Sequence, residues 1–178
     1  FSKSLACNQH NPFTWSVKAD SFVFIKETDM FSRFSKTAVD KCAENGGGTV
    51  FVPAGTYLTG PIFLKSNINL NLEAGATLLF SNDIEEYPVV TSRWEGVKQD
   101  CYASLINADN CENISITGRG TLDGQGAFWW KIFRAKENKY PRPKMIAPYE
   151  CKNVLIQGVT LTNSPSWTIN TILCDNVT

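Results

Sequence analysis

The chain contains six cysteines and one histidine, the side chains from which structural zinc sites are usually built. The cysteines are Cys7, Cys42, Cys101, Cys111, Cys151 and Cys174, and the histidine is His10. No two cysteines form a Cys-x-x-Cys pair, so a zinc site built from cysteine and histidine is not indicated, and we predict no metal ligands. We expect most of the cysteines to be small buried apolar residues, and their spacing leaves disulfide formation open.

The acidic residues that stand out are better explained by local structure than by catalysis. Asp123 precedes Gly124, and an Asp-Gly pair is typical of a turn. Glu85 and Glu86 lie in a polar stretch with no evident partner. The glycines of 46–48 lack the Lys-Ser/Thr that completes a phosphate-binding loop. We therefore predict no catalytic residue from these motifs.

The composition indicates one globular domain and excludes two classes of partner. The chain has 178 residues, with 17 basic and 17 acidic side chains, so its formal charge is zero. A neutral chain is not a polybasic nucleic-acid binder. Hydrophobic residues make up 43% and charged residues 19%, and no apolar run is long enough to span a bilayer. We predict neither a nucleic-acid nor a membrane partner.

The sequence pattern predicts one helix followed by many short strands. These elements must position the residues discussed above. Phe31, Phe34, Ala38 and Cys42 form one apolar stripe, which predicts a helix over 29–45 that ends at the glycines of 46–48. After Thr49 the pattern changes to short apolar alternations rich in β-branched residues, which predict strands. The expected strands are 49–52, 68–72, 77–80, 114–117, 154–157, 159–162 and 168–172.

A repeat predicts how these strands are arranged. Cys-x-Asn followed by Ile or Val occurs at 111–114, 151–154 and 174–177, and Ser66-Asn67-Ile68 is an earlier relative. The starts are separated by 45, 40 and 23 residues. About 23 residues with two or three strands suit one rung of a parallel β-helix. The longer spacings then predict loops near 85–102 and 124–145.

Equivalent positions of successive rungs lie on top of one another in such a solenoid. We therefore expect Cys111, Cys151 and Cys174 to stack, and we expect the asparagines two residues later to form a ladder of amide hydrogen bonds along the axis. We assign these asparagines a structural role, because the ladder satisfies polar groups at a tight bend.

Three further stretches resemble the pectin-degrading glycoside hydrolases of family 28, the polygalacturonases. They are GGGTVFVPAGTY at 46–57, GRGTLDGQG at 118–126 followed by Trp129-Trp130, and Asn153-Val154 through NSPSW at 163–167. The resemblance implies an all-β fold, a right-handed parallel β-helix with a short N-terminal capping helix. We expect a single domain over 1–178, with 1–48 as N-terminal segment and cap and 49–178 as rungs.

The resemblance also implies inverting hydrolysis of α-1,4 bonds between galacturonate units, without a cofactor. Inversion needs a carboxylic acid and a carboxylate on opposite faces of the sugar. The family supplies its catalytic and substrate-gripping groups in Asn-x-Asp, Asp-Asp, Gly-His-Gly and Arg-Ile-Lys motifs. The last three motifs do not occur here, and Asn107-Ala108-Asp109 matches the first by letters only, so we interpret Asp109 as a turn residue. We expect the catalytic carboxylates beyond residue 178 and an inactive isolated chain.

Five residues are candidates for contact with the acidic polysaccharide that the resemblance implies as partner. Tryptophan offers a face to sugar rings, and arginine binds carboxylate with two parallel hydrogen bonds. If 124–145 is extended, Trp129 and Trp130 point to opposite sides and one of them faces a groove. The candidates are Trp129, Trp130, Arg142, Lys144 and Trp167. Trp94, Tyr102 and Arg134 are weaker ones. We expect a secreted or periplasmic monomer.

Two alternatives stay open. A pectate-lyase-like β-helix would break the same bond by elimination and would need a calcium cluster of carboxylates, which the sequence does not display. A non-catalytic polysaccharide-binding solenoid would bind the same polymer without turnover.

Overall fold

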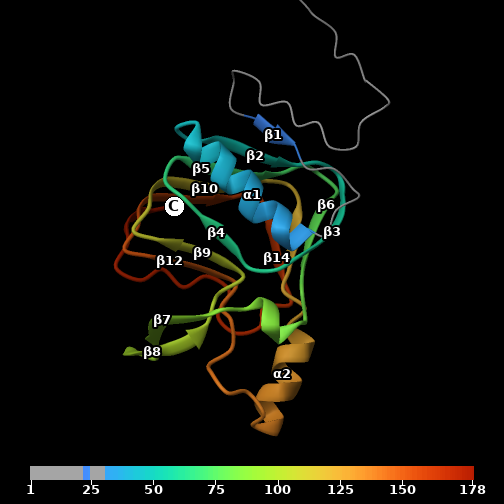
Figure 1. The fold of residues 1–178 in the computed structure, drawn as a ribbon, viewed down its shortest axis with the longest axis vertical. Coiled ribbons are helices and arrows are strands. Elements are labelled where there is room, and N and C mark those ends of the chain that lie inside the picture. The colour runs from blue at the N-terminus through green and yellow to red at the C-terminus, as the bar shows by residue number, and fades with distance from the viewer. Residues whose placement is uncertain (1–21, 25–30) are drawn as a thin grey trace, which may run out of the picture.

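The protein is a solenoid of short strands with a helix at one end (Figure 1). The structure is a computed structural model and describes residues 22–24 and 31–178. Cys7 and His10 lie outside these residues. The helices are α1 Phe31–Glu44 and α2 Gly126–Ala135, and a 3-10 turn spans Ile84–Glu86. The strands are β1 Phe22–Phe24, β2 Gly48–Val52, β3 Gly55–Thr59, β4 Ile62–Leu64, β5 Ile68–Leu72, β6 Ala76–Phe80, β7 Val89–Trp94, β8 Val97–Tyr102, β9 Ile106–Asp109, β10 Glu112–Gly118, β11 Thr121–Asp123, β12 Ile146–Tyr149, β13 Lys152–Gln157, β14 Thr160–Thr162 and β15 Asp175–Val177.

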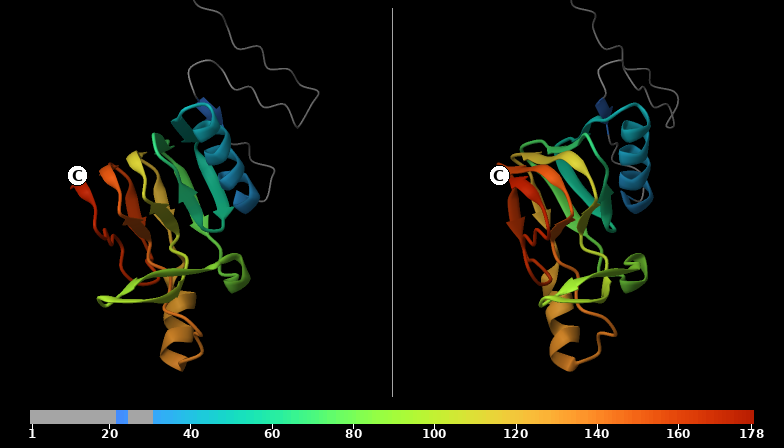
Figure 2. Two further views of the ribbon diagram at one scale, coloured as in Figure 1. Left: turned by 60° about the vertical axis from the view of Figure 1, so that its left-hand side comes forward. Right: turned by 90° about the vertical axis from the view of Figure 1, so that its left-hand side faces the viewer.

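Three parallel sheets run along the solenoid. Their strand orders are β1-β2-β5-β10-β13-β15, β3-β6-β11-β14 and β4-β9-β12. Each rung passes from one sheet to the next, and equivalent residues pair between rungs: Leu70 lies beside Val50 and Ile116. Figure 2 shows the rungs stacked from α1 to the C-terminus. The right-handed parallel β-helix expected from the repeat and from the resemblance is confirmed.

The core lies inside the rungs because alternate residues of each strand point inward. In β5 and β6 the buried and half-buried side chains alternate strictly. Leu78 and Leu122 are fully buried and stack in register, and Leu161 continues the column with partial exposure. An apolar column of this kind buries the inner face of every rung except the terminal ones.

Helix α1 covers the N-terminal end of the core. Its side chains Ala38, Val39 and Cys42 are almost completely buried, and the helix contacts β2, β3 and β4. The expected capping helix is therefore present, with ends within two residues of the predicted ones. The side chains of Phe31 and Phe34, which belong to the predicted stripe, lie outside the described side chains.

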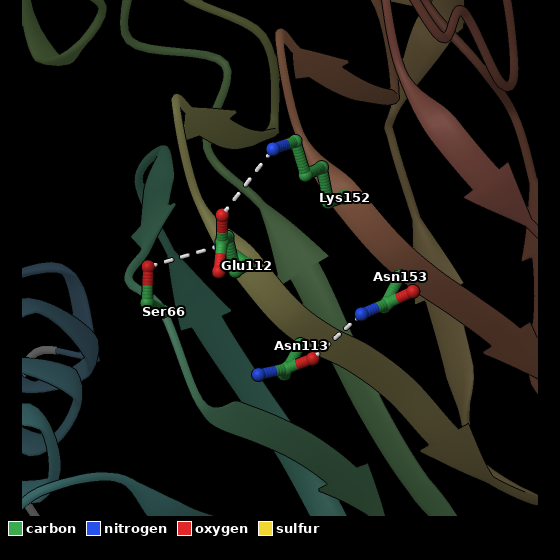
Figure 3. Close-up of polar contacts among 5 residues, drawn as sticks. All are labelled: Ser66, Glu112, Asn113, Lys152 and Asn153. Atoms are coloured by element: carbon green, nitrogen blue, oxygen red, sulfur yellow. Dashed lines mark hydrogen bonds and ion pairs between the residues drawn. The ribbon is translucent and has the colours of Figure 1, made fainter.

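An asparagine ladder runs along the start of four of the six strands of the largest sheet, β5, β10, β13 and β15. Asn113 Nδ2 donates to Asn67 Oδ1 over 3.0 Å, Asn153 donates to Asn113 over 2.9 Å, and Asn176 donates to Asn153 over 2.8 Å. All four have φ between 54° and 62°, the left-handed region that asparagine tolerates well. Figure 3 shows two of them beside the exposed Lys152–Glu112 ion pair. The predicted structural ladder is confirmed.

The stacked cysteines are free thiols. Each of Cys111, Cys151 and Cys174 donates its Sγ hydrogen to the carbonyl two residues earlier, over 3.2 to 3.4 Å. Burial raises the pKa of the Cys111 thiol, and it raises the pKa of Cys151 to about 11. Cys42 and Cys101 are also buried. The raised pKa values keep the thiols of Cys111 and Cys151 protonated at neutral pH.

Three of the expected elements were wrong. The 85–102 loop contains an antiparallel hairpin, β7–β8, whose two-residue turn is Glu95-Gly96. The 124–145 loop contains helix α2. Residues 168–172 make only two isolated bridges, at Ile169 and Ile172, instead of a strand.

The helix could have been found from its apolar spacing. Phe128, Trp129 and Ile132 recur at helical intervals and pack on the core, whereas Lys131 and Arg134 are exposed. Neither helix of the described residues has the length and apolar character that crossing a bilayer requires.

Candidate functional site

A cleft of about 730 Å³ lies beside the sheet formed by β4, β9 and β12, with residues of hairpin β7–β8 on its other side. Because β-strand side chains alternate, this sheet sends every second residue outward into the cleft. The lining residues that carry polar or charged groups are Lys65, Ser66, Thr91, Ser92, Lys98, Ser104, Asn107, Asp109, Tyr149 and Glu150. The volume falls within the range of about 300–1,000 Å³ that is usual for ligand sites.

The charged groups of the cleft are of both signs. Lys65 is paired with Asp40 over 2.5 Å, and this hydrogen bond raises the pKa of Lys65. A hydrogen bond to Glu150 raises the pKa of Tyr149. Lys98 is exposed on β8. Lys65 and Lys98 therefore bring positive charge to the cleft, and Asp109 and Glu150 bring negative charge.

The hairpin is anchored to the rung that follows α2. Lys144 is 2% exposed, and its Nζ donates to the carbonyl oxygen of Arg93 over 2.6 Å. Burial lowers the pKa of this lysine. Trp94, the last residue of β7, packs on Trp167 with ring centroids 4.4 Å apart. These two contacts hold one wall of the cleft.

The structure places the two adjacent tryptophans differently from the extended segment that was expected. In a helix, neighbouring side chains diverge by about 100° rather than 180°. Trp129 has no exposed surface and packs against Tyr87, Tyr102 and Phe128, so it belongs to the core. Trp130 is half-buried, and its Nε1 donates to the carbonyl oxygen of Ser164 over 3.0 Å.

The other candidates lie on two different surfaces. Trp167 is 38% exposed beside the hairpin. Arg142 lies on the α2 side, where its Nη1 donates to the carbonyl oxygen of Pro165 over 2.8 Å. None of the five candidates lines the cleft itself. Their role in substrate contact stays a prediction.

The acidic candidates have local roles. Asp123 Oδ1 accepts hydrogen bonds from the Gln125 backbone and from Asn163 Nδ2, each over 3.0 Å, as expected of a turn. Glu85 and Glu86 belong to the 3-10 turn. Asp109 is the last residue of β9 rather than a turn residue, and its position lines the cleft. No group of three metal-ligating side chains occurs in the part of the chain that the structure describes.

Sequence reasoning missed the cleft residues Lys98, Asn107 and Tyr149. The signal for Lys98 was the alternation on both sides of Glu95-Gly96, which indicates a hairpin. Asn107 and Tyr149 occupy adjacent rungs, and Asn107 Oδ1 accepts from the Ser104 backbone over 2.9 Å. Whether a face of a strand lines a cleft depends on where the hairpin packs, and the sequence of the strand alone does not specify that position.

Comparison with known proteins agrees with the fold and the motifs. The model of glycosyl hydrolases family 28 matches residues 42–178. A probable polygalacturonase of Vitis vinifera is 37% identical over 145 residues, which are 78% of this chain and 30% of that protein. An exo-poly-α-D-galacturonosidase of Dickeya chrysanthemi is 40% identical over 108 residues, 56% of this chain and 17% of that protein.

A solved structure gives the same result. The hyperthermoactive exopolygalacturonase of Thermotoga maritima superposes with a TM-score of 0.74 at 36% identity, over 82% of this chain and 41% of that one. The chain thus spans less than half the length of each of these three relatives. The motifs, the rung architecture and the family match together show that this chain belongs to glycosyl hydrolases family 28.

Proposed function

We propose that this chain forms the N-terminal scaffold of a polygalacturonase-like enzyme, which hydrolyses α-1,4-galacturonosyl bonds of pectin with inversion. The observation that carries the proposal is the family-28 match over residues 42–178. Relatives named as polygalacturonases, both exo- and endo-acting, support the substrate class.

The cleft beside β4, β9 and β12 is the surface on which we propose that the acidic polymer lies. It is large enough for part of a saccharide chain, and Lys65 and Lys98 offer positive charge to uronate carboxylates. Tyr149 offers a hydroxyl group on the sheet side, whereas the Asn107 amide is held by its own hydrogen bonds to Ser104 and Ile62.

We propose that the acid and the base are supplied by residues outside 1–178. Inverting hydrolysis uses two carboxyl groups about 6.5–9.5 Å apart, with room for water between them. The sequence contains no Asp-Asp, Gly-His-Gly or Arg-Ile-Lys motif. The contribution of the present residues is then to bind and orient the polymer and to hold the wall of the cleft.

Among the aromatic and basic candidates, Trp167, Trp130 and Arg142 remain proposed saccharide contacts. Trp129 and Lys144 act through packing in this proposal, because both side chains are almost entirely buried. We further propose a secreted or periplasmic monomer that needs no cofactor.

The test compares the complete gene product with residues 1–178 on polygalacturonate. The complete protein is expected to release reducing ends without a rise in ultraviolet absorbance, since elimination by a lyase would leave an absorbing unsaturated product. The 1–178 chain is expected to release none above a no-protein control. Ultraviolet-absorbing products would support the lyase alternative, and binding without any cleavage by the complete protein would support a binding solenoid.

A further inference from the structure

Helix α2 and the segment after it concentrate positive charge in a chain whose formal charge is zero. Residues 126–144 contain one acidic side chain, Glu137. Their basic side chains are Lys131, Arg134, Lys136, Lys139, Arg142 and Lys144. The ion pairs among the described residues join Lys65 to Asp40 and Lys152 to Glu112, so neither neutralises this segment. The segment therefore presents a local field that attracts anions.

Two of these cations, Arg134 and Arg142, line a hollow with aromatic walls. Trp130, Phe133, Arg134 and Arg142 line a depression of about 460 Å³. Phe133 is 48% exposed at this hollow. An exposed aromatic face offers a platform for the apolar C–H face of a sugar ring.

One cation of the hollow is held in place before any ligand arrives. The guanidinium carbon of Arg142 lies 4.0 Å above the Phe133 ring centroid, and Nη1 donates to the carbonyl oxygen of Pro165 over 2.8 Å. Burial lowers the pKa of Arg142, and its buried Nε has no hydrogen-bond partner in the described part of the chain. A partly desolvated guanidinium without a carboxylate partner gains when an anionic ligand supplies one.

The hollow is separate from the cleft. The two share no lining residue. Figure 1 shows α2 projecting beyond the stacked rungs, and Figure 2 shows the same projection from two other sides. A ligand on α2 therefore occupies a surface outside the cleft.

We propose that this hollow is a second, non-catalytic binding site for an acidic saccharide. A uronate carboxylate binds between Arg142 and Arg134, and its sugar ring packs on the part of the Phe133 ring that Arg142 leaves uncovered. The choice of ligand rests on the proposed function, because a polygalacturonate chain offers both a carboxylate and a pyranose face at every unit. Such a site keeps a polymer near the cleft and raises its local concentration there.

The test measures binding of the complete gene product by electrophoresis through gels that contain polygalacturonate. Fully methylesterified pectin and poly-glutamate serve as comparison polymers. The variants are Arg134→Gln, which removes an exposed charge, and Phe133→Ala, which removes the platform. Arg119→Gln is the matched control, since Arg119 is exposed in the β10–β11 turn and lines neither the hollow nor the cleft. Thermal unfolding of each variant checks its fold.

We expect Arg134→Gln to bind polygalacturonate about tenfold more weakly, the effect of losing one charge-assisted hydrogen bond. Phe133→Ala should weaken binding to polygalacturonate but not to poly-glutamate, and Arg119→Gln should bind as wild type. Equal retardation of Arg134→Gln and wild type overturns the site. If Phe133→Ala weakens binding to polygalacturonate and to poly-glutamate equally, the proposal that the site recognises a saccharide is overturned. Wild-type protein that binds polygalacturonate through these residues yet cleaves none overturns the proposed function and leaves the site standing.

Discussion

Lys144 Nζ donates to the backbone carbonyl of Arg93 over 2.6 Å and so joins two segments 51 residues apart in the sequence. Lys144 is buried on the rung side, and Arg93 belongs to β7 of the hairpin. The adjacent Trp94–Trp167 contact reinforces this connection. A buried cation and an aromatic pair thus join one wall of the cleft to the following rung.

Replacing Lys144 by alanine is expected to loosen the hairpin. The Arg93 carbonyl loses a hydrogen bond from a charged donor, and such a bond contributes about 1.5–3 kcal/mol. Urea unfolding measures the loss of stability, and hydrogen exchange should show reduced protection confined to β7 and β8. Lys152→Ala is the control, because the exposed Lys152–Glu112 pair contributes at most about 1 kcal/mol. Equal losses for the two variants would contradict the anchoring role.

Asn113 is expected to stabilise the fold through both its side chain and its backbone conformation. Asn113→Ala removes two amide hydrogen bonds, each contributing about 0.5–1.5 kcal/mol, and places a Cβ-bearing residue at φ 55°. Asn113→Gly removes the same bonds but accepts this conformation. The alanine variant should therefore be less stable than the glycine variant by about 1 kcal/mol in denaturant unfolding. A more stable alanine variant would show that the left-handed backbone is not a constraint here.

Gly118 is expected to tolerate no side chain. Its φ is 112°, and a Cβ there would lie 2.0 Å from the Leu72 carbonyl oxygen of the preceding rung. Gly118→Ala should lower the free energy of unfolding by about 3 kcal/mol or more, because backbone must move. At Gly96, φ is 85° but no atom lies within 4 Å of a built Cβ, so Gly96→Ala should cost only about 1 kcal/mol. Similar losses at both glycines would rule out the close approach of the rungs as the cause.

Cys151 predicts a pH dependence of stability in the alkaline range. Burial raises the pKa of its thiol from 9.0 to about 11. Between these values the folded protein holds a proton that the unfolded chain has lost, so stability falls as pH rises through this window. The unfolding free energy of wild type should therefore decline more steeply between pH 9 and 11 than that of Cys151→Ala, while their difference stays constant from pH 6 to 8. Parallel curves over the whole range would show that the thiol does not titrate differently in the two states.

The repeat and the glycine and asparagine residues that separate the strands determined the solenoid. Successive rungs place the same residue types at the same bend. The repeated Cys-x-Asn at 111–113 and 151–153 therefore predicts a stack of equivalent positions. The family motifs then indicated the handedness and the kind of chemistry. Local physics sufficed at these places because strand alternation, the glycine breaks and the left-handed asparagines are properties of short segments.

Only the tertiary structure decided what the two insertions do. Trp129 and Trp130 are neighbours in sequence, but helix α2 sends one into the core and leaves the other half-exposed. In the sequence Lys144 resembles a surface cation, but in the structure it is buried and bonded to the hairpin. Contacts between segments tens of residues apart set burial, and burial sets whether a charged or aromatic side chain meets a ligand or another part of the protein.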